Sequence, residues 1–205
     1  MASQIQICNL AIGRAGSQFF INSLQDPTSE ARVCAAIYDT VLERVLQDFP
    51  WPFARIISAL QDVGSPVAPW LYRYRYPNDC LQVKRVFPSG GVQMYGVPSK
   101  TIGTAYQVVN DTGSDAKAIL SDIPSALVEY TAKVTNTALF SPAFVNAFAW
   151  AIVAEIATPL SADAKYAQAA ATTYKGVLAE AAALASNENQ QDPEGDCDLD
   201  AARNA

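Results

Sequence analysis

The chain of 205 residues contains no histidine. Histidine is the usual general base near neutral pH and the commonest metal ligand, and it completes the Ser-His and Cys-His pairs of nucleophilic catalysis. The sequence also lacks a Gly-rich phosphate loop and a Gly-x-Ser-x-Gly elbow. We therefore predict that the protein is not an enzyme and holds no cofactor.

Cysteine is scarce, and its spacing is irregular. Cys8, Cys34, Cys80 and Cys197 include no Cys-x-x-Cys pair. Two of the four fall on apolar helix rows, where a reduced thiol behaves as a small hydrophobic group. We therefore expect neither disulfides nor a zinc site.

Long hydrophobic runs are missing as well. No uninterrupted apolar run reaches the roughly 18 residues that span a bilayer. The N-terminal MASQIQICNL has neither the basic start nor the long apolar stretch of a secretory signal. We expect a protein that is made in the cytoplasm and has no membrane partner.

Positive charge is sparse, with 14 Lys and Arg against 20 Asp and Glu. From residue 187 onward there are six acids and one arginine, a net charge of -5, which leaves -1 for the rest of the chain. Tight binding to a phosphate backbone needs clustered Lys and Arg. The composition therefore argues against a protein that grips nucleic acid.

Helical spacing of apolar residues predicts two helices before residue 50. The first lies within 3–15, and the linker 17–25, with Phe19 and Phe20, is apolar enough that we expect it to pack along the helices. The second has Asp26 as N-cap and Pro27 at its first position. It runs to about residue 48, and two adjacent apolar rows face the core: Val33, Ile37, Val41, Val45 and Cys34, Tyr38, Leu42, Leu46.

A proline-rich corner follows the second helix. Pro50 and Pro52 cannot sit inside a helix and favour extended backbone before them. Trp51 and Phe53 are therefore expected to fill the joint between a helical layer and a sheet.

The period then changes to two, and turn residues separate short runs rich in Val, Ile, Tyr and Thr. We predict strands at 53–60, 70–76, 82–87, 104–109, 116–120 and 128–134, with turns at 64–66, 90–91 and 110–113.

Two further helices are predicted toward the C-terminus. Ser141 and Pro142 open the third, which is apolar on nearly every side apart from Asn146 and Glu155, and Pro159 is expected to break it. Ser161 or Asp163 caps the fourth, over 164–185. The predicted fold is α+β and mainly α: a bundle of about four helices (1–52 and 136–186), a β-rich insert (53–135) and a flexible acidic tail (187–205).

Three patterns could indicate a binding or catalytic site. Trp70–Tyr76 alternates aromatics with arginines. The pattern suits a stacking platform for single-stranded nucleic acid. It also suits a half-buried strand whose arginines lie in water or against a neighbour's carboxylates, and we favour this second interpretation. The acids of the tail alternate as in a calcium loop but lack its glycine and glutamate in register, so we predict no metal site. Pairing of Glu155 with Glu129 or Asp163 for hydrolysis finds no support in the spacing.

Three motifs carry a family resemblance. They are the helix that ends in Pro50-Trp51-Pro52-Phe53-Ala54-Arg55, the tyrosine-bearing strand followed by Pro77-Asn78-Asp79-Cys80-Leu81, and the paired helices of 141–185 that begin with Ser-Pro-x-Phe. In this order the chain resembles the head-to-tail adaptors of short-tailed bacteriophages, of the tail tubular protein A or tail accessory factor type.

The resemblance implies a virion protein of the head–tail junction. In that family twelve copies form a ring beneath the portal, close the filled head, join it to the tail nozzle and let double-stranded DNA pass without specific binding. By chemistry and position, Arg73, Arg75, Lys84 and Arg85 of the β-rich insert are candidates for tail-side or neighbour contacts, and Trp51 and Phe53 are expected to be structural residues of the corner. The resemblance also marks Asp79 as the cap of its turn. Its candidate portal contacts are Asp192, Glu194, Asp196, Asp198, Leu199 and Asp200.

Two other classes of protein stay open. One is a small module that grips single-stranded nucleic acid or another tail component through the Arg and Tyr strand. The other is a tail-associated hydrolase, which would need an essential carboxylate, and none stands out in the sequence.

Overall fold

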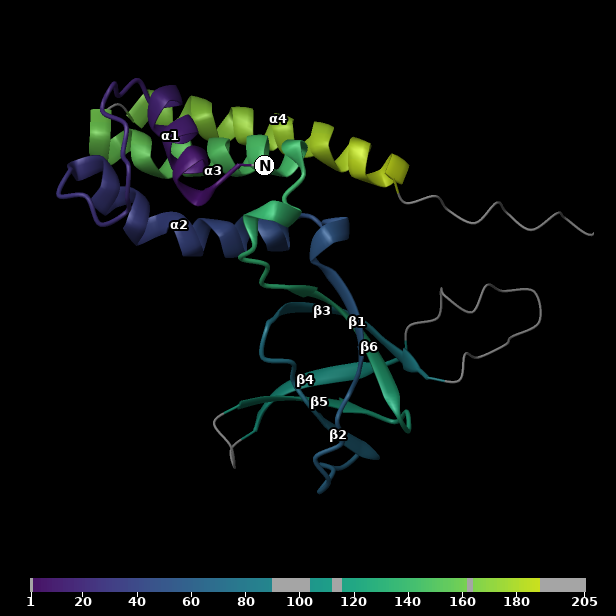
Figure 1. The fold of residues 1–205 in the computed structure, drawn as a ribbon. Coiled ribbons are helices and arrows are strands. Elements are labelled where there is room, and N and C mark those ends of the chain that lie inside the picture. The colour runs from purple at the N-terminus through teal and green to yellow at the C-terminus, as the bar shows by residue number, and fades with distance from the viewer. Residues whose placement is uncertain (1, 90–103, 112–115, 162–163, 189–205) are drawn as a thin grey trace, which may run out of the picture.

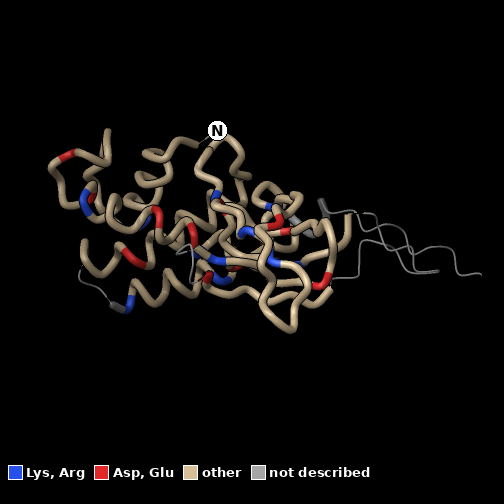
Figure 2. The backbone as a smooth tube through the Cα atoms, turned by 90° about the horizontal axis from the view of Figure 1, so that it is seen from below, with Lys and Arg blue, Asp and Glu red and all other residues tan. Residues whose placement is uncertain are grey.

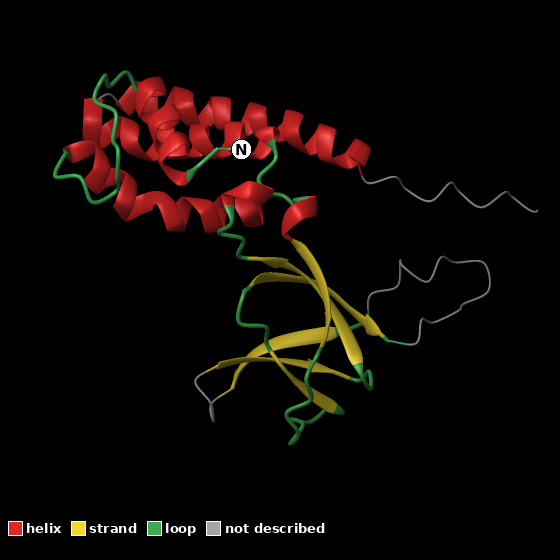
Figure 3. Ribbon diagram, viewed as in Figure 1, coloured by secondary structure: helices red, strands yellow, loops and turns green. Residues whose placement is uncertain are grey.

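The computed structural model describes residues 2–89, 104–111, 116–161 and 164–188. These residues form six β-strands and four α-helices: α1 (Gln4–Arg14), α2 (Ser29–Asp48), α3 (Pro142–Ser161) and α4 (Ala164–Glu188). The helices lie together in one layer, and the strands form a second part beside it (Figures 1 and 3). The predicted α+β class is confirmed.

The first two helices begin at side-chain caps. Ser3 and Gln6 form a capping box at α1, in which the Gln6 N–H donates to the Ser3 hydroxyl at 3.2 Å. The prediction that Asp26 caps α2 is wrong, because Thr28 caps it. The Asp26 carboxylate accepts from the N–H groups of Asn22 and Ser23 instead, so it holds the preceding loop and Pro27 lies outside the helix.

The linker before α2 packs only in part. Ile21 is buried and Asn9 exchanges two hydrogen bonds of 2.8 Å with its backbone, but Phe19 and Phe20 are exposed. The expectation that the whole linker packs along the helices is therefore wrong for these two residues. The backbone beside these two residues is nevertheless fixed, because Asn9 binds the backbone of Ile21, the residue that follows Phe20.

Helix α3 is central to the layer and contacts α1, α2 and α4. By length and composition Pro142–Leu160 could cross a membrane, but half of this stretch is buried in the fold. A core helix has the same composition, and packing against three helices accounts for it. Its largest buried side chains are Phe144, Phe148, Ile152 and Ile156.

Pro159 does not break α3 where the sequence predicted. The helix continues to Ser161. A proline in the last turn removes only the hydrogen bond from its own position to the carbonyl of Glu155. The helix tolerates that loss because it ends two residues later.

The two buried cysteines belong to the helical core. Cys8 on α1 and Cys34 on α2 are free thiols, as is the half-buried Cys80. A hydrogen bond between the two thiols, and then burial, raise the pKa of Cys8. Both act as small core residues, as predicted from the apolar rows.

The strands form two three-stranded antiparallel sheets. Sheet A has the order β1 (Arg55–Ala59), β6 (Ala126–Ala132), β3 (Cys80–Pro88), and sheet B has the order β2 (Tyr72–Arg75), β5 (Ala116–Ser121), β4 (Tyr106–Asp111). Both sheets contribute to a second core of Leu60, Tyr74, Val86, Ile119, Ile123, Val128 and Tyr130. The predicted turn at 90–91 and part of that at 110–113 lie outside the described residues.

The helical layer and the sheets meet at the proline-rich corner. Trp51 lies between α2 and the short helix η1 (Pro52–Ala54), is buried, and donates its indole N–H to the Val45 carbonyl at 2.8 Å. Its ring packs edge-on against Phe144, with centroids 4.9 Å apart, and Phe53 packs against Phe144 at the same distance. Across the same junction Lys133 pairs with Glu43 of α2 at 2.6 Å.

Candidate interaction surfaces

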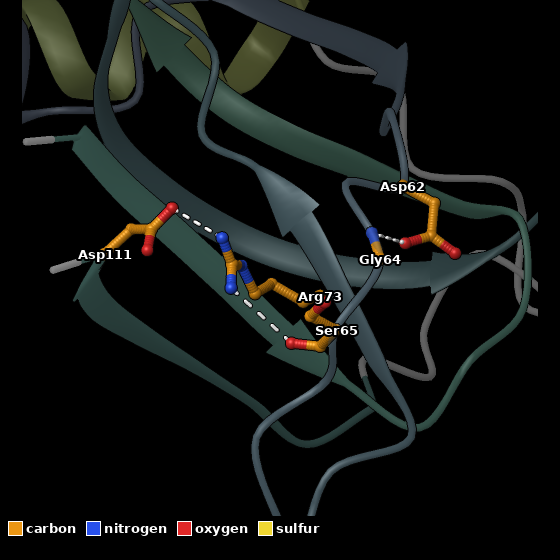
Figure 4. Close-up of polar contacts among 5 residues, drawn as sticks. All are labelled: Asp62, Gly64, Ser65, Arg73 and Asp111. Atoms are coloured by element: carbon orange, nitrogen blue, oxygen red, sulfur yellow. Dashed lines mark hydrogen bonds and ion pairs between the residues drawn. The ribbon is translucent and has the colours of Figure 1, made fainter. Parts of the chain in front are cut away.

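Arg73 on β2 is paired within its own chain. Its Nη2 contacts the Asp111 carboxylate at 2.6 Å, and Nη1 reaches the Ser65 carbonyl at 3.5 Å (Figure 4). An Asx turn, in which the Gly64 N–H donates to Asp62 at 2.8 Å, shapes the loop that supplies Ser65. The Nε of Arg73 is buried and has no hydrogen-bond partner among the described residues.

A second ion cluster lies across sheet A. Glu129 is buried on β6 and contacts Arg55 of β1 at 2.6 Å and Arg85 of β3. The guanidinium of Arg85 also lies over the Phe87 ring, 5.7 Å from its centroid. One buried carboxylate thus contacts two arginines from the strands on either side of β6.

The four predicted contact cations do not form one patch. Arg73 and Arg75 belong to sheet B, whereas Lys84 and Arg85 belong to β3 of sheet A. Lys84 donates to Gln82 at 2.6 Å, and the exposed Arg75 lines a small cavity of about 210 Å³ between the sheets. Basic and acidic residues are interspersed over the backbone (Figure 2). The described residues therefore offer no continuous cationic track for a phosphate backbone.

The tyrosines of β2 face inward rather than outward. Tyr74 is buried, and its hydroxyl donates to the Ile123 carbonyl at 2.5 Å; burial raises its pKa. Tyr72 stacks on it, with ring centroids 6.1 Å apart. Stacking of bases needs exposed ring faces, and the buried ring of Tyr74 has no exposed face.

Asp79 acts differently from the predicted turn cap. The turn is closed by the Cys80 N–H, which donates to the Pro77 carbonyl at 3.1 Å. The Asp79 carboxylate instead accepts from the Tyr130 hydroxyl at 3.0 Å, and its carbonyl accepts from the Lys133 N–H at 2.7 Å. Asp79 therefore ties the turn to β6.

The carboxylates considered for catalysis are kept apart by their partners. Asn146 and Glu155 of α3 both bind arginines: Asn146 accepts from Arg14 at 2.7 Å, and Glu155 pairs with Arg44 at 2.6 Å on the surface. Glu129 belongs to sheet A, and Asp163 lies outside the described residues. Within the described part of the chain no three His, Cys, Asp or Glu residues gather as metal ligands.

An apolar groove lies where α2 ends. It encloses about 600 Å³ between the proline-rich corner, the start of α3 and the last third of α4. Leu139 and Leu184 line it and remain 53% and 59% exposed. Sequence reasoning missed this groove because its walls come from three segments that are far apart in the chain: Trp51, Pro52 and Phe53; Leu139, Ser141, Pro142 and Ala143; Ala181 and Leu184.

A pair of exposed phenylalanines lies at the start of α2, on the linker from α1. Phe19 is 72% and Phe20 62% exposed. Phe20 also lines a shallow cavity of about 490 Å³ on α1, with Leu10 and Gly13. The sequence signal for this surface was present, two adjacent phenylalanines in a linker, but was interpreted as packing.

The predicted portal contacts, Asp192 to Asp200, lie outside the described residues. Two comparisons with known proteins found no match: no protein-family model matches the chain, and no curated protein matches it. Its function is therefore argued from the sequence motifs and from these surfaces.

Proposed function

We propose that the chain is a head-to-tail adaptor of a short-tailed bacteriophage. Twelve copies would form a ring beneath the portal, close the filled head and attach the tail nozzle. In this proposal 1–52 and 136–186 form the helical body, 53–135 the β-rich insert, and 187–205 an acidic segment that docks on the portal.

The observation that carries the proposal is the Pro-Trp-Pro-Phe-Ala-Arg segment. This is one of the three motifs that together resemble the family, and its Trp51 is a buried residue at the place where α2, α3 and the first strand meet. A motif that fixes the angle between a helical layer and a sheet suits a protein that must hold two binding partners at a set distance from each other. An adaptor between portal and nozzle needs that property.

The charge distribution supports a channel rather than a nucleic-acid-binding protein. Arg55, Arg73 and Arg85 are held by carboxylates of the same chain. A ring of such subunits would present little uncompensated positive charge to the DNA in its lumen. The genome could then leave without being retained.

A complementation experiment tests the proposal. Heads filled in the absence of this protein should lose their DNA and lack tails, and addition of the purified protein should restore DNA retention and tail attachment. A variant truncated after Ser186 should fail in the attachment step if the acidic tail contacts the portal. Heads that retain DNA and acquire tails without the protein would contradict the adaptor function.

A further inference from the structure

We propose that copies of this chain bind one another head to tail, with Phe19 and Phe20 of one copy inserted in the apolar groove at the proline-rich corner of the next. The inference rests on the proposed ring and names the surface that closes it. We call the two phenylalanines the knob and the cavity lined by Trp51, Phe53, Leu139 and Leu184 the groove.

The knob is held in place although its rings are exposed. Ile21, the next residue, is buried and fixed by two hydrogen bonds with Asn9. The Phe19 N–H donates to the Ser17 hydroxyl at 3.3 Å, and Ser17 in turn binds Glu30 of α2 at 3.1 Å. An anchored backbone loses little conformational freedom when its side chains enter a partner, which favours binding.

The groove has the chemistry and the size for two aromatic rings. Its lining is mostly apolar and includes Trp51, Phe53 and Leu184. Its volume of about 600 Å³ lies within the roughly 300–1,000 Å³ of pockets that enclose a small ligand. Two phenyl side chains have the bulk of such a ligand.

The knob and the groove lie at opposite ends of α2. The knob precedes its first residue and the groove follows its last, and a 20-residue helix is about 30 Å long. Figure 1 shows the linker before α2 at one end of the helical layer and η1 at the other. A knob cannot fill the groove of its own chain, so each copy has one free surface of each kind. Contacts of this type are heterologous, so association does not stop at a dimer, and a ring forms where the rotation between neighbouring copies closes.

The exposed apolar area fits the centre of such an interface. A buried phenylalanine contributes roughly 150–250 Å², so the knob at its observed exposure offers on the order of 250 Å². A stable interface buries about 800 Å² per partner. The knob thus supplies about a third of one side, and a few residues near the centre of an interface carry most of the binding energy.

Cross-linking tests the contact directly. One preparation carries Phe20→Cys and a second Leu184→Cys, both with Cys80→Ser and Cys197→Ser, and the two are mixed with a short bis-maleimide, with and without portal rings. We expect a mixed cross-linked pair that does not form when Leu71→Cys, an equally exposed leucine of the β-rich part, replaces Leu184→Cys. The inference would be overturned if Leu184→Cys gave no more cross-linked pair than the Leu71→Cys control, both with and without portal rings.

Matched glutamine variants test the energetics. Phe19→Gln/Phe20→Gln removes the knob and Leu139→Gln/Leu184→Gln the apolar rim of the groove; Leu71→Gln is the control. Each double variant should weaken self-association about tenfold or more, measured by sedimentation velocity. A mixture of the two should stop at pairs, because each pair holds one intact contact and no third copy can join. Assembly of both variants equal to that of the control would overturn the inference.

Portal binding separates this inference from the proposed function. Wild-type chain that decorates portal rings while both double variants decorate them equally well would leave the adaptor function intact and overturn the knob-and-groove contact. Cross-linking at the expected positions without portal binding would support the contact and contradict the adaptor. Knob variants that self-associate as the wild type does but no longer bind portal rings would place the knob on the portal and overturn the inference.

Discussion

At the scale of single residues, Trp51 joins the helical layer to the sheets. Its ring contacts Phe49, Phe53 and Phe144, and its indole N–H satisfies the Val45 carbonyl in the last turn of α2, one of the carbonyls that a helix end leaves without a partner. Packing and hydrogen bonding therefore act through the same side chain.

Trp51→Ala should lower the free energy of unfolding by about 3–5 kcal/mol, because it leaves a cavity among aromatic rings. Trp51→Phe should cost less, about 1–2 kcal/mol, since it keeps most of the packing and loses the bond to Val45. Urea denaturation measures both. Equal losses for the two variants would show that packing is not the larger contribution.

Glu129 and Glu155 make ion pairs of similar length in different surroundings. Glu129 is buried between two arginines, whereas Glu155 and Arg44 are 43% and 44% exposed. Glu129→Gln should destabilise the fold by about 2 kcal/mol or more, because it removes the buried negative charge that contacts both Arg55 and Arg85. Glu155→Gln should cost at most about 1 kcal/mol. Chemical denaturation measures the free energy of unfolding of both variants. A larger loss for Glu155→Gln than for Glu129→Gln would contradict this prediction.

Tyr130 makes stability depend on alkaline pH. Burial and then the neighbouring Asp79 carboxylate raise its pKa to about 12. An unfolded tyrosine loses its proton near pH 10, so between about pH 10 and 12 the unfolded chain binds fewer protons than the folded one and stability falls as pH rises. Below pH 10 this contribution is fully present.

Tyr130→Phe should flatten part of that decline while lowering stability near pH 8 by about 1 kcal/mol through loss of the bond to Asp79. Urea denaturation at pH 8 and pH 11 measures both effects. A variant whose stability falls as steeply as that of the wild type would exclude Tyr130 as a source of the alkaline sensitivity.

At the scale of elements, Thr28 decides where α2 begins. Thr28→Ala should lower the free energy of unfolding by about 1 kcal/mol, because the Ala31 N–H loses its 3.2 Å bond to the threonine hydroxyl. Thr28→Ser keeps that acceptor and should remain close to wild type in the same thermal or urea unfolding experiment. A serine variant as unstable as the alanine variant would argue against a capping role.

Periodicity predicted the segments that became helices and strands, since apolar spacing follows from which face is buried. Local competition was harder to predict: Asp26 and Thr28 are both good caps, and hydrogen bonds from Asn22 and Ser23 decide between them. Partners distant in sequence were not predictable at all. Nothing near Arg73 indicates that Asp111 neutralises it, and nothing near Phe53 indicates that Leu184 lies across a groove.

At the scale of the whole molecule, the chain combines a rigid joint, two apolar surfaces at opposite ends of its helical layer and paired arginines. Because the body outside the acidic tail carries a net charge of only -1, the protein should not be retained on heparin or single-stranded DNA resin at physiological salt. Arg75→Glu should leave this behaviour unchanged. Strong retention that Arg75→Glu abolishes would favour a nucleic-acid-binding module.

The most direct test of the adaptor function is the mass of single portal rings before and after addition of this protein. The proposal predicts that each ring gains a fixed mass equal to twelve chains of 22.0 kDa, with no partly filled population at saturation. Portal rings whose mass does not change, beside a chain that remains monomeric, would contradict it.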